Sequence, residues 1–168
     1  MTARTSTDRP PAPTVTLESI NVSDGGVPKL PRQEAHVGAD GVAGDRQRDL
    51  HFHGGPSRAV SLYSLERLQA LRAEGHPIDP GTTGENLTLS GLPWERIQTG
   101  MRLAIGDLLL EVTKPAHPCK TIAGSFVGGE FKRISEKVHP GWSRFYARVL
   151  REGDVRVGDP VVLVAAEG

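Results

Sequence analysis

Short apolar runs separated by turns are the feature that most constrains how this chain can fold. Its 20 glycines and 13 prolines are spread along the sequence rather than gathered in one segment. Between them, apolar and polar residues alternate over short stretches, as they do in strands that bury one face. Long helices would be broken by turn residues at this density. We therefore expect a mostly β domain, with a barrel-like arrangement of strands and two or three short inserted helices.

The alternation places the expected strands. Residues 14–22 alternate with one slip, which predicts a strand that contains a bulge. Residues 27–37 form a second extended segment, and Pro28 and Pro31 keep it away from the centre of a sheet, because proline has no amide hydrogen for the ladder. Pro115 should end the strand before it for the same reason. Further strands are expected at 59–63, 84–90, 101–105, 108–113 and 144–150, with the last strands ending at Val164.

Two short helices are expected among these strands. Ser64 is a good N-cap for a helix with leucines at 65, 68 and 71 on one side, and Gly75 would end it. A second apolar repeat at helical spacing runs from Gly129 to Val138 and is stopped by Pro140. Both helices would be short insertions in a strand-rich domain.

Charge balance and the chain ends argue against several classes of protein. Lysine plus arginine equals aspartate plus glutamate at 20 each, so the basic excess that suits a polymeric nucleic acid is missing. No apolar run approaches the ~18 residues that a membrane span needs. Residues 1–13 lack the apolar core of a signal peptide, and we expect a disordered tail there, followed by a single domain over 14–168.

The single cysteine, Cys119, lies in the segment Lys114-Pro-Ala-His-Pro-Cys-Lys120, which places it just beyond a predicted strand end. Positive charges nearby favour the thiolate, which is the form that attacks electrophiles and binds soft metals. Taken alone, however, a lone cysteine is more often a small buried apolar residue. One cysteine cannot form an internal disulfide, so we expect a reducing compartment, the cytoplasm.

A histidine pair raises the possibility of a metal site. His51 and His53 are two residues apart, so both rings would face the same way in an extended segment. Together with Cys119 and either Asp45 or Asp49, they could complete the tetrahedral coordination of zinc. The alternative is that both histidines make ordinary hydrogen bonds within a loop.

The loop over residues 38–58 has little apolar periodicity, and its length favours a functional role. Its end contains Gly54 and Gly55, followed by Arg58. Backbone amides of a glycine turn beside a guanidinium suit a phosphate group. Asn86 enters a later strand, where its amide could pair with the edge of a heterocycle or simply stabilise a turn. Together these residues suit an anionic, phosphorylated, sulfur-rich or metal-bearing ligand.

Several motifs follow one another along about residues 15–165. In order they are Gly-Ala-Asp-Gly-Val-Ala-Gly-Asp45, His-Gly-Gly-Pro-Ser-Arg-Ala-Val60, Gly-Glu-Asn-Leu-Thr88, Gly106-Asp107, Pro-Cys119, Gly141-Trp142, Tyr-Ala-Arg-Val-Leu-Arg-Glu-Gly-Asp154 and Val-Gly-Asp159. This order resembles the MOSC domain, the module at the C-terminus of molybdenum cofactor sulfurases. The chain is most similar in kind to the free-standing bacterial proteins of the 6-hydroxylaminopurine-resistance type, which are related to the amidoxime-reducing component of mitochondria.

The resemblance implies a strand-rich, barrel-like MOSC fold that binds the molybdenum–molybdopterin cofactor. In reductase members the matching cysteine is a molybdenum ligand, whereas in sulfurase-type members it handles sulfur for the cofactor. By position this residue is Cys119, which would be both the catalytic residue and the metal ligand. From their donor types, the expected cofactor contacts are His53, Gly54, Gly55, Arg58, Asn86, Lys114 and Lys120.

Two departures from the family shape the expected function. No pyridoxal phosphate is expected on this chain alone, because the aminotransferase-like domain of full-length sulfurases is missing. No cysteine set for an iron–sulfur cluster is present, so electrons would come from a separate flavin or iron–sulfur protein. Our leading hypothesis is an oxidoreductase that reduces N-hydroxylated bases or related small-molecule substrates. The alternatives are a sulfur carrier with a persulfide on Cys119 and a non-catalytic binding domain with an inert cysteine.

Overall fold

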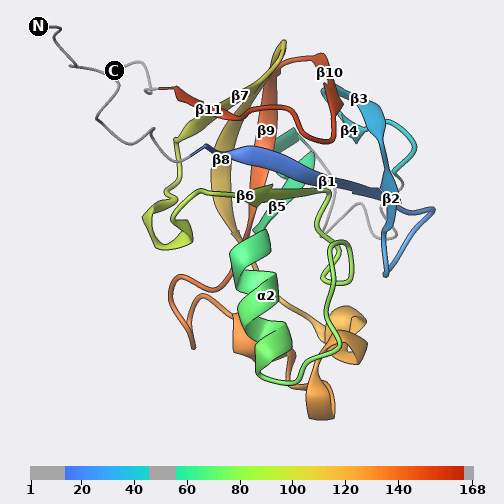
Figure 1. Cartoon of the computed structure of the whole chain (residues 1–168), viewed down its shortest axis with the longest axis vertical. Coiled ribbons are helices and arrows are strands. Elements are labelled where there is room, and N and C mark those ends of the chain that lie inside the picture. Colours follow the sequence, from blue (N-terminus) through green and yellow to red (C-terminus); the bar gives the residue numbers. More distant parts are fainter. Residues whose placement is uncertain (1–13, 46–55, 165–168) are drawn as a thin grey trace, which may run out of the picture.

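A computed structural model describes residues 14–45 and 56–164 of the chain (Figure 1). Most of its strands form one eight-stranded sheet, in the order β11-β7-β8-β9-β5-β6-β1-β2, and the others form a three-stranded sheet, β10-β3-β4. The strands are β1 (Thr16–Val22), β2 (Leu30–Arg32), β3 (Glu34–Gly38), β4 (Gly41–Val42), β5 (Val60–Ser64), β6 (Leu87–Ser90), β7 (Arg102–Ile105), β8 (Leu108–Ala116), β9 (Arg144–Arg151), β10 (Gly153–Arg156) and β11 (Val162–Val164). The mostly β fold class is therefore confirmed.

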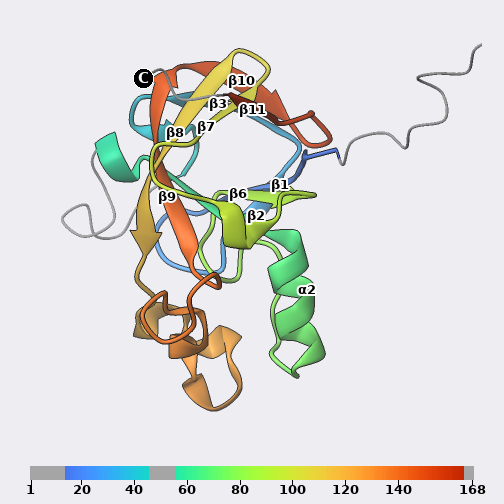
Figure 2. The same ribbon diagram turned by 90° about the vertical axis from the view of Figure 1, so that its left-hand side faces the viewer.

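The large sheet curls around a core without closing into a regular barrel (Figure 2). Its ladder ends at β11 on one side and at β2 on the other. The segment just before β11 nevertheless bonds to the start of β1, where the Leu17 amide donates to Asp159 O at 2.9 Å and the Val161 amide donates to Val15 O at 2.8 Å. The expected barrel-like arrangement thus holds only loosely, as a curled open sheet. The predicted bulge in β1 is confirmed by a register shift between Leu17 and Ser19.

An apolar row crosses the sheet and fills the core. Leu62 on β5 lies opposite Leu87 on β6 and Phe145 on β9, and Leu87 in turn lies opposite Ile20 on β1. All four side chains are buried. Because neighbouring residues of a strand point to opposite faces, the residues between them form a second row on the other face of the sheet.

The first predicted helix is confirmed as α2 (Leu65–Ala73), which buries Leu68 and Leu71. Its N-cap is Ser64, whose Oγ accepts the amide hydrogen of Arg67 at 3.1 Å. Gly75 follows the helix with a φ of 104°, a conformation that glycine adopts at little cost. The helix thus begins and ends where its capping residues predicted.

The second predicted helix, over 129–138, is present only over its middle part and is a 3₁₀ helix rather than an α-helix. The chain there forms a short 3₁₀ helix, and further 3₁₀ helices precede it. Gly128 and Gly129 have φ values of 67° and 73°, which interrupt any continuous helix. The 3₁₀ helices of the described residues are η2 (Pro56–Arg58), η3 (Trp94–Arg96), η4 (Lys120–Ser125), η5 (Val127–Gly129) and η6 (Phe131–Ile134).

The strand end expected at Pro115 was also wrong, because β8 continues to Ala116. Pro115 lies opposite Phe145, just after an irregularity in the register between Val112 and Lys114. Proline is tolerated in a sheet near such bulges. Cys119 still lies beyond the strand, as predicted.

The 3₁₀ segment that follows Cys119 lies beside α2 at one end of the molecule (Figure 1). Arg133 of this segment donates two hydrogen bonds to the carboxylate of Glu74, at 2.9 and 2.7 Å, just after the end of α2. The amide of Val127 donates to Nδ1 of His76 at 3.0 Å. In the described part of the chain, no helix is long and apolar enough to cross a membrane.

Gly81 provides a test of how the turn before β6 is held against the segment that contains Lys29. The Lys29 amide donates to Gly81 O at 2.9 Å, and a Cβ on Gly81 would overlap the carbonyl oxygen of Lys29. We expect Gly81→Ala to lose about 1–3 kcal/mol more unfolding free energy than Gly75→Ala. Both glycines have a positive φ, 89° and 104°, but an added Cβ at Gly75 meets nothing within 4 Å. Urea denaturation would measure both losses, and equal losses would contradict a close approach at Gly81.

Candidate functional site

The second row of the sheet is polar, yet it is also buried. Tyr146 on β9 lies opposite Ser61 on β5 and Lys114 on β8. Ser61 is bonded in turn to Asn86, whose amide donates to Ser61 O at 2.9 Å. Ser61, Asn86 and Tyr146 are buried, and Lys114 is half-buried. We call the row of Ser61, Asn86, Lys114 and Tyr146 the polar row. Buried polar side chains need partners, and within the row Ser61 and Asn86 supply them to each other.

Cys119 lies just beyond β8, the strand that carries Lys114 of the polar row. It follows the end of β8 and has an extended backbone, with φ of −139° and ψ of 174°. Its carbonyl oxygen accepts the amide hydrogen of Ile122 at 3.1 Å, which starts η4. The thiol is free and the residue is partly exposed. The alternative of an inert cysteine predicts slow alkylation of this thiol, and it stays open as a prediction.

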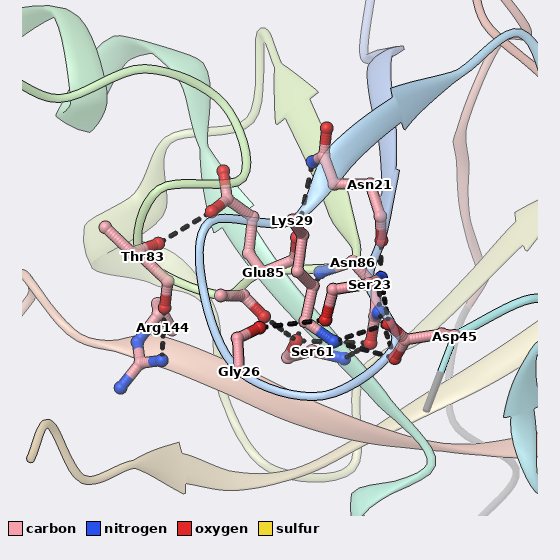
Figure 3. Close-up of polar contacts among 11 residues, drawn as sticks. Asn21, Ser23, Gly26, Lys29, Asp45, Ser61, Thr83, Glu85, Asn86 and Arg144 are labelled. Atoms are coloured by element: carbon pink, nitrogen blue, oxygen red, sulfur yellow. Dashed lines mark hydrogen bonds and ion pairs between the residues drawn. The ribbon is translucent and has the colours of Figure 1, made fainter. Parts of the chain in front are cut away.

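Asn86 is held by four hydrogen bonds of its side chain (Figure 3). Its Oδ1 accepts from the amide and the hydroxyl of Ser61, at 3.0 and 3.2 Å. Its Nδ2 donates to Asn21 O at 3.2 Å and to Oδ2 of Asp45 at 2.9 Å. The side chain is only 1% exposed. This geometry makes Asn86 a positioning residue within the protein, and a direct contact with a cofactor stays a prediction.

Asp45 joins Asn86 to a buried ion pair. Lys29 Nζ lies 2.7 Å from both carboxylate oxygens of Asp45, and the two side chains are 9% and 4% exposed. The amide of Ser23 donates to Asp45 Oδ1 at 2.9 Å. Asp45 is thereby committed to Lys29, Ser23 and Asn86, which leaves it poorly placed as a zinc ligand. In the ranges 14–45 and 56–164, no group of three or more His, Cys, Asp and Glu side chains could hold a metal ion.

His51, His53, Gly54 and Gly55 lie outside the described residues, as does Asp49. The described residues on each side of them are nevertheless fixed on the sheet. Before the gap, Asp45 is held by Lys29, Ser23 and Asn86. After the gap, the Thr113 hydroxyl donates to Ser57 O at 2.6 Å. The predicted roles of the two histidines and two glycines stay predictions.

Arg58 contacts the ring of Tyr146, and Lys114 lies opposite the same residue across the sheet. The guanidinium of Arg58 lies 5.8 Å from the ring centre of Tyr146, within the range of a cation–π contact. Lys114 lies opposite Tyr146 in the ladder between β8 and β9. Lys120 starts η4 directly after Cys119 and is exposed. The structure therefore brings Arg58 and Lys114 together and leaves Lys120 on the surface beside the thiol.

Tyr146 and Arg144 were missed by the sequence reasoning. Both lie on β9 and alternate with the buried apolar residues Phe145 and Ala147. A strand whose second face carries large polar residues was the available signal, because that face would otherwise be expected to meet water. In the structure, Arg144 and Tyr146 on this face are buried instead.

Glu85 is a fully buried carboxyl beside Asn86. Its oxygens accept hydrogen bonds from the hydroxyls of Thr83 and Thr88, at 2.7 and 2.9 Å. Burial raises the pKa of the Glu85 carboxyl above its usual range, while the hydroxyl hydrogen bonds act in the opposite direction. Glu85 thus stabilises the turn that enters β6.

Breaking the Lys29–Asp45 pair should be costly. Asp45→Ala leaves a buried ammonium without a carboxylate, and we expect a loss of about 3–5 kcal/mol of unfolding free energy. The double variant Lys29→Met/Asp45→Leu removes both charges and should recover part of that loss. Glu34→Ala is the control, because its pair with Arg156 is 65% and 71% exposed and should contribute less than about 1 kcal/mol. A loss at Asp45 as small as that at Glu34 would contradict the buried network.

The raised pKa of Glu85 should make the unfolding free energy depend on pH. Since its pKa is raised on folding, the folded protein binds this proton more tightly than the unfolded chain does. Its stabilising contribution is complete below the ordinary pKa of glutamate and is lost as pH rises through the raised pKa. We therefore expect Glu85→Gln to become more favourable relative to wild type as pH rises from about 4 to 8. Denaturation at several pH values tests this, with the exposed Glu130→Gln as control, and parallel curves for all three proteins would refute it.

A family model for the MOSC domain matches residues 49–162, which is more than half of the chain. The chain is 32% identical over 142 residues to the uncharacterized protein YflK of Bacillus subtilis, covering 83% of this chain and 63% of that protein. It is 35% identical over 132 residues to a protein of Gibberella moniliformis named as a reductase, covering 75% of this chain and 23% of that protein. It thus spans less than two thirds of the length of either relative.

Among solved structures, the crystal structure of YiiM from Geobacillus stearothermophilus superposes with a TM-score of 0.69. That match has 28% sequence identity and covers 90% of this chain and 75% of the other. The family model, the relative of more than 30% identity and the shared fold agree with the order of motifs along the sequence. The chain belongs to the MOSC domain family.

Proposed function

We propose that this chain binds the molybdenum–molybdopterin cofactor beside Cys119 and acts as an oxidoreductase on N-hydroxylated bases or related compounds. MOSC domains are associated with molybdenum cofactor binding in general, and one relative is named as a reductase. The observation that supports the proposal is the free, partly exposed Cys119 just beyond β8, the strand that carries Lys114 of the polar row. A pyridoxal phosphate site is not part of the proposal.

The donors present suit such a cofactor. Thiolate is a soft ligand, which fits a molybdenum centre, and Cys119 supplies the one thiol of the chain. Arg58, which contacts the Tyr146 ring, and Lys114, which lies opposite Tyr146 in the sheet, would offset the negative charge of a phosphorylated pterin, and Lys120 adds a charge at the surface. Oδ1 of Asn86 accepts a hydrogen bond from the amide of Ser61 and so fixes the backbone of Ser61. His53, Gly54 and Gly55 complete the proposed contacts.

The reaction breaks an N–O bond, consumes two electrons and two protons, and releases water and an amine. When bound, the cofactor would supply the two-electron redox chemistry of this reaction. The protein's part is to hold the metal through the Cys119 sulfur, to balance charge with Arg58 and Lys114, and to leave the thiol side open to a small substrate. Because the chain has a single cysteine, the electrons are assigned to a separate flavin or iron–sulfur protein.

Replacement of the thiol is the direct test. Purified Cys119→Ser, produced in a host that makes the cofactor, should reduce 6-hydroxylaminopurine at least about 100-fold more slowly than wild type with reduced methyl viologen as donor. The Ser57→Ala variant, altered near Arg58 but away from the thiol, should stay within a few-fold of wild type. Undiminished activity in the serine variant would refute the proposal.

The same preparations separate the reductase from the sulfur carrier. Molybdenum and pterin content of the wild-type protein should be near stoichiometric if the chain is a reductase. A sulfur atom on Cys119 that a reductant removes, seen by mass spectrometry in protein without pterin, would instead favour the carrier. The cytoplasmic location expected from the single thiol stays a prediction that cell fractionation can check.

A further inference from the structure

Arg144 is a buried cation that has no carboxylate partner among residues 14–45 and 56–164. Its side chain comes from the first residue of β9, and the residue is 8% exposed. Nη1 donates to Thr83 O at 2.7 Å, and Nη2 makes a longer contact of 3.4 Å with His117 O. Nε is buried and has no hydrogen-bond partner. Of the five N–H groups of a guanidinium, only a minority is thus committed within the protein.

No ion pair within the described residues compensates this charge. Glu85 lies on the same turn as Thr83, but its carboxyl is bonded to two threonine hydroxyls rather than to Arg144. Burial also raises the pKa of Glu85, which weakens the negative charge on that carboxyl. Buried charges in proteins are almost always paired or bound to an ion. The missing negative charge at Arg144 therefore calls for a ligand.

Arg144 lies next to residues 117–119, the segment that follows β8 and ends at Cys119, which we call the thiol loop. Arg144 lies opposite Ala116, the last residue of β8, and contacts the backbone of His117 in the segment that leads to Cys119. It also shares its face of β9 with Tyr146, two residues further along the strand. A guanidinium at this place extends the polar row towards Cys119.

We infer that Arg144 is an anion-binding residue whose counter-charge is an oxyanion of the phosphate class bound at the Cys119 end of the polar row. The inference deepens the proposed function and rests on it for the source of the oxyanion, which would be the cofactor. The geometry alone requires only an anion. A guanidinium suits this role because its N–H groups form a rigid fork that matches an oxyanion.

The test measures stabilisation of the cofactor-free protein by phosphate, with chloride used to keep the ionic strength constant. Wild type should melt at a higher temperature in phosphate, and the apparent Kd for phosphate should rise at least about tenfold in Arg144→Met. Arg148→Met is the matched control, because Arg148 is exposed on the same strand and pairs with Glu111. It should respond to phosphate as wild type does.

A second variant distinguishes the loss of an anion site from a general loss of folding. Arg144→Lys keeps the charge but loses the fork, so it should fold and show phosphate binding between that of wild type and Arg144→Met. Equal stabilisation by phosphate in Arg144→Met and wild type would overturn the inference. So would a wild-type protein that phosphate stabilises no more than chloride does.

Pterin content identifies the source of the oxyanion. In protein from a host that makes the cofactor, Arg144→Met should retain less pterin than Arg148→Met. If wild-type protein from this host holds no pterin, but its stabilisation by phosphate still depends on Arg144, the anion site is supported and the proposed function is contradicted. Full pterin retention in Arg144→Met, with phosphate binding unchanged, would contradict the anion site and leave the proposed function standing.

Discussion

The buried carboxylate of Asp45 is the group on which the polar face of the sheet depends. It accepts hydrogen bonds from Lys29, from the amide of Ser23 and from Asn86. A charge in this position would be costly without all three, because the surrounding protein replaces water poorly. Once satisfied, it fixes Asn86, and through Asn86 it fixes the backbone of Ser61 in the middle of the sheet. The network therefore determines where polar groups can be presented to a ligand.

The two faces of the central strands differ in character, one being apolar and the other polar. The apolar row through Leu62 and Phe145 supplies the burial that stabilises the domain. The polar row contributes less to stability, since each buried polar group must recover the hydration it has lost. Strand β5 shows this division within five residues, all buried, where Ser61 bonds to Asn86 while Val60 and Leu62 belong to the apolar core. A face that costs stability in this way is typical of a binding site.

Local patterns predicted the fold well, while tertiary contacts decided much of the site. The bulge in β1, the cap of α2 at Ser64 and the position of Cys119 beyond β8 depend on neighbouring residues alone, so the sequence was sufficient. The 3₁₀ segment that replaced the second predicted helix is held by contacts such as that between Arg133 and Glu74, far away in the chain. The same is true of the polar row, because register pairing between distant strands is invisible in a single sequence.

A continuous chain of contacts links the buried network to the thiol loop. Lys29 bonds through its amide to Gly81, at the start of the turn that carries Thr83 and Glu85. The carbonyl of Thr83 accepts from Arg144, whose other nitrogen reaches the backbone beside Cys119. The segment before the thiol is therefore linked to a turn that is closely packed at Gly81 and to Arg144, a cation with no charge partner in the part of the chain that the structure describes. An anion at Arg144 would strengthen the last link, so ligand binding and the placement of Cys119 should be energetically coupled.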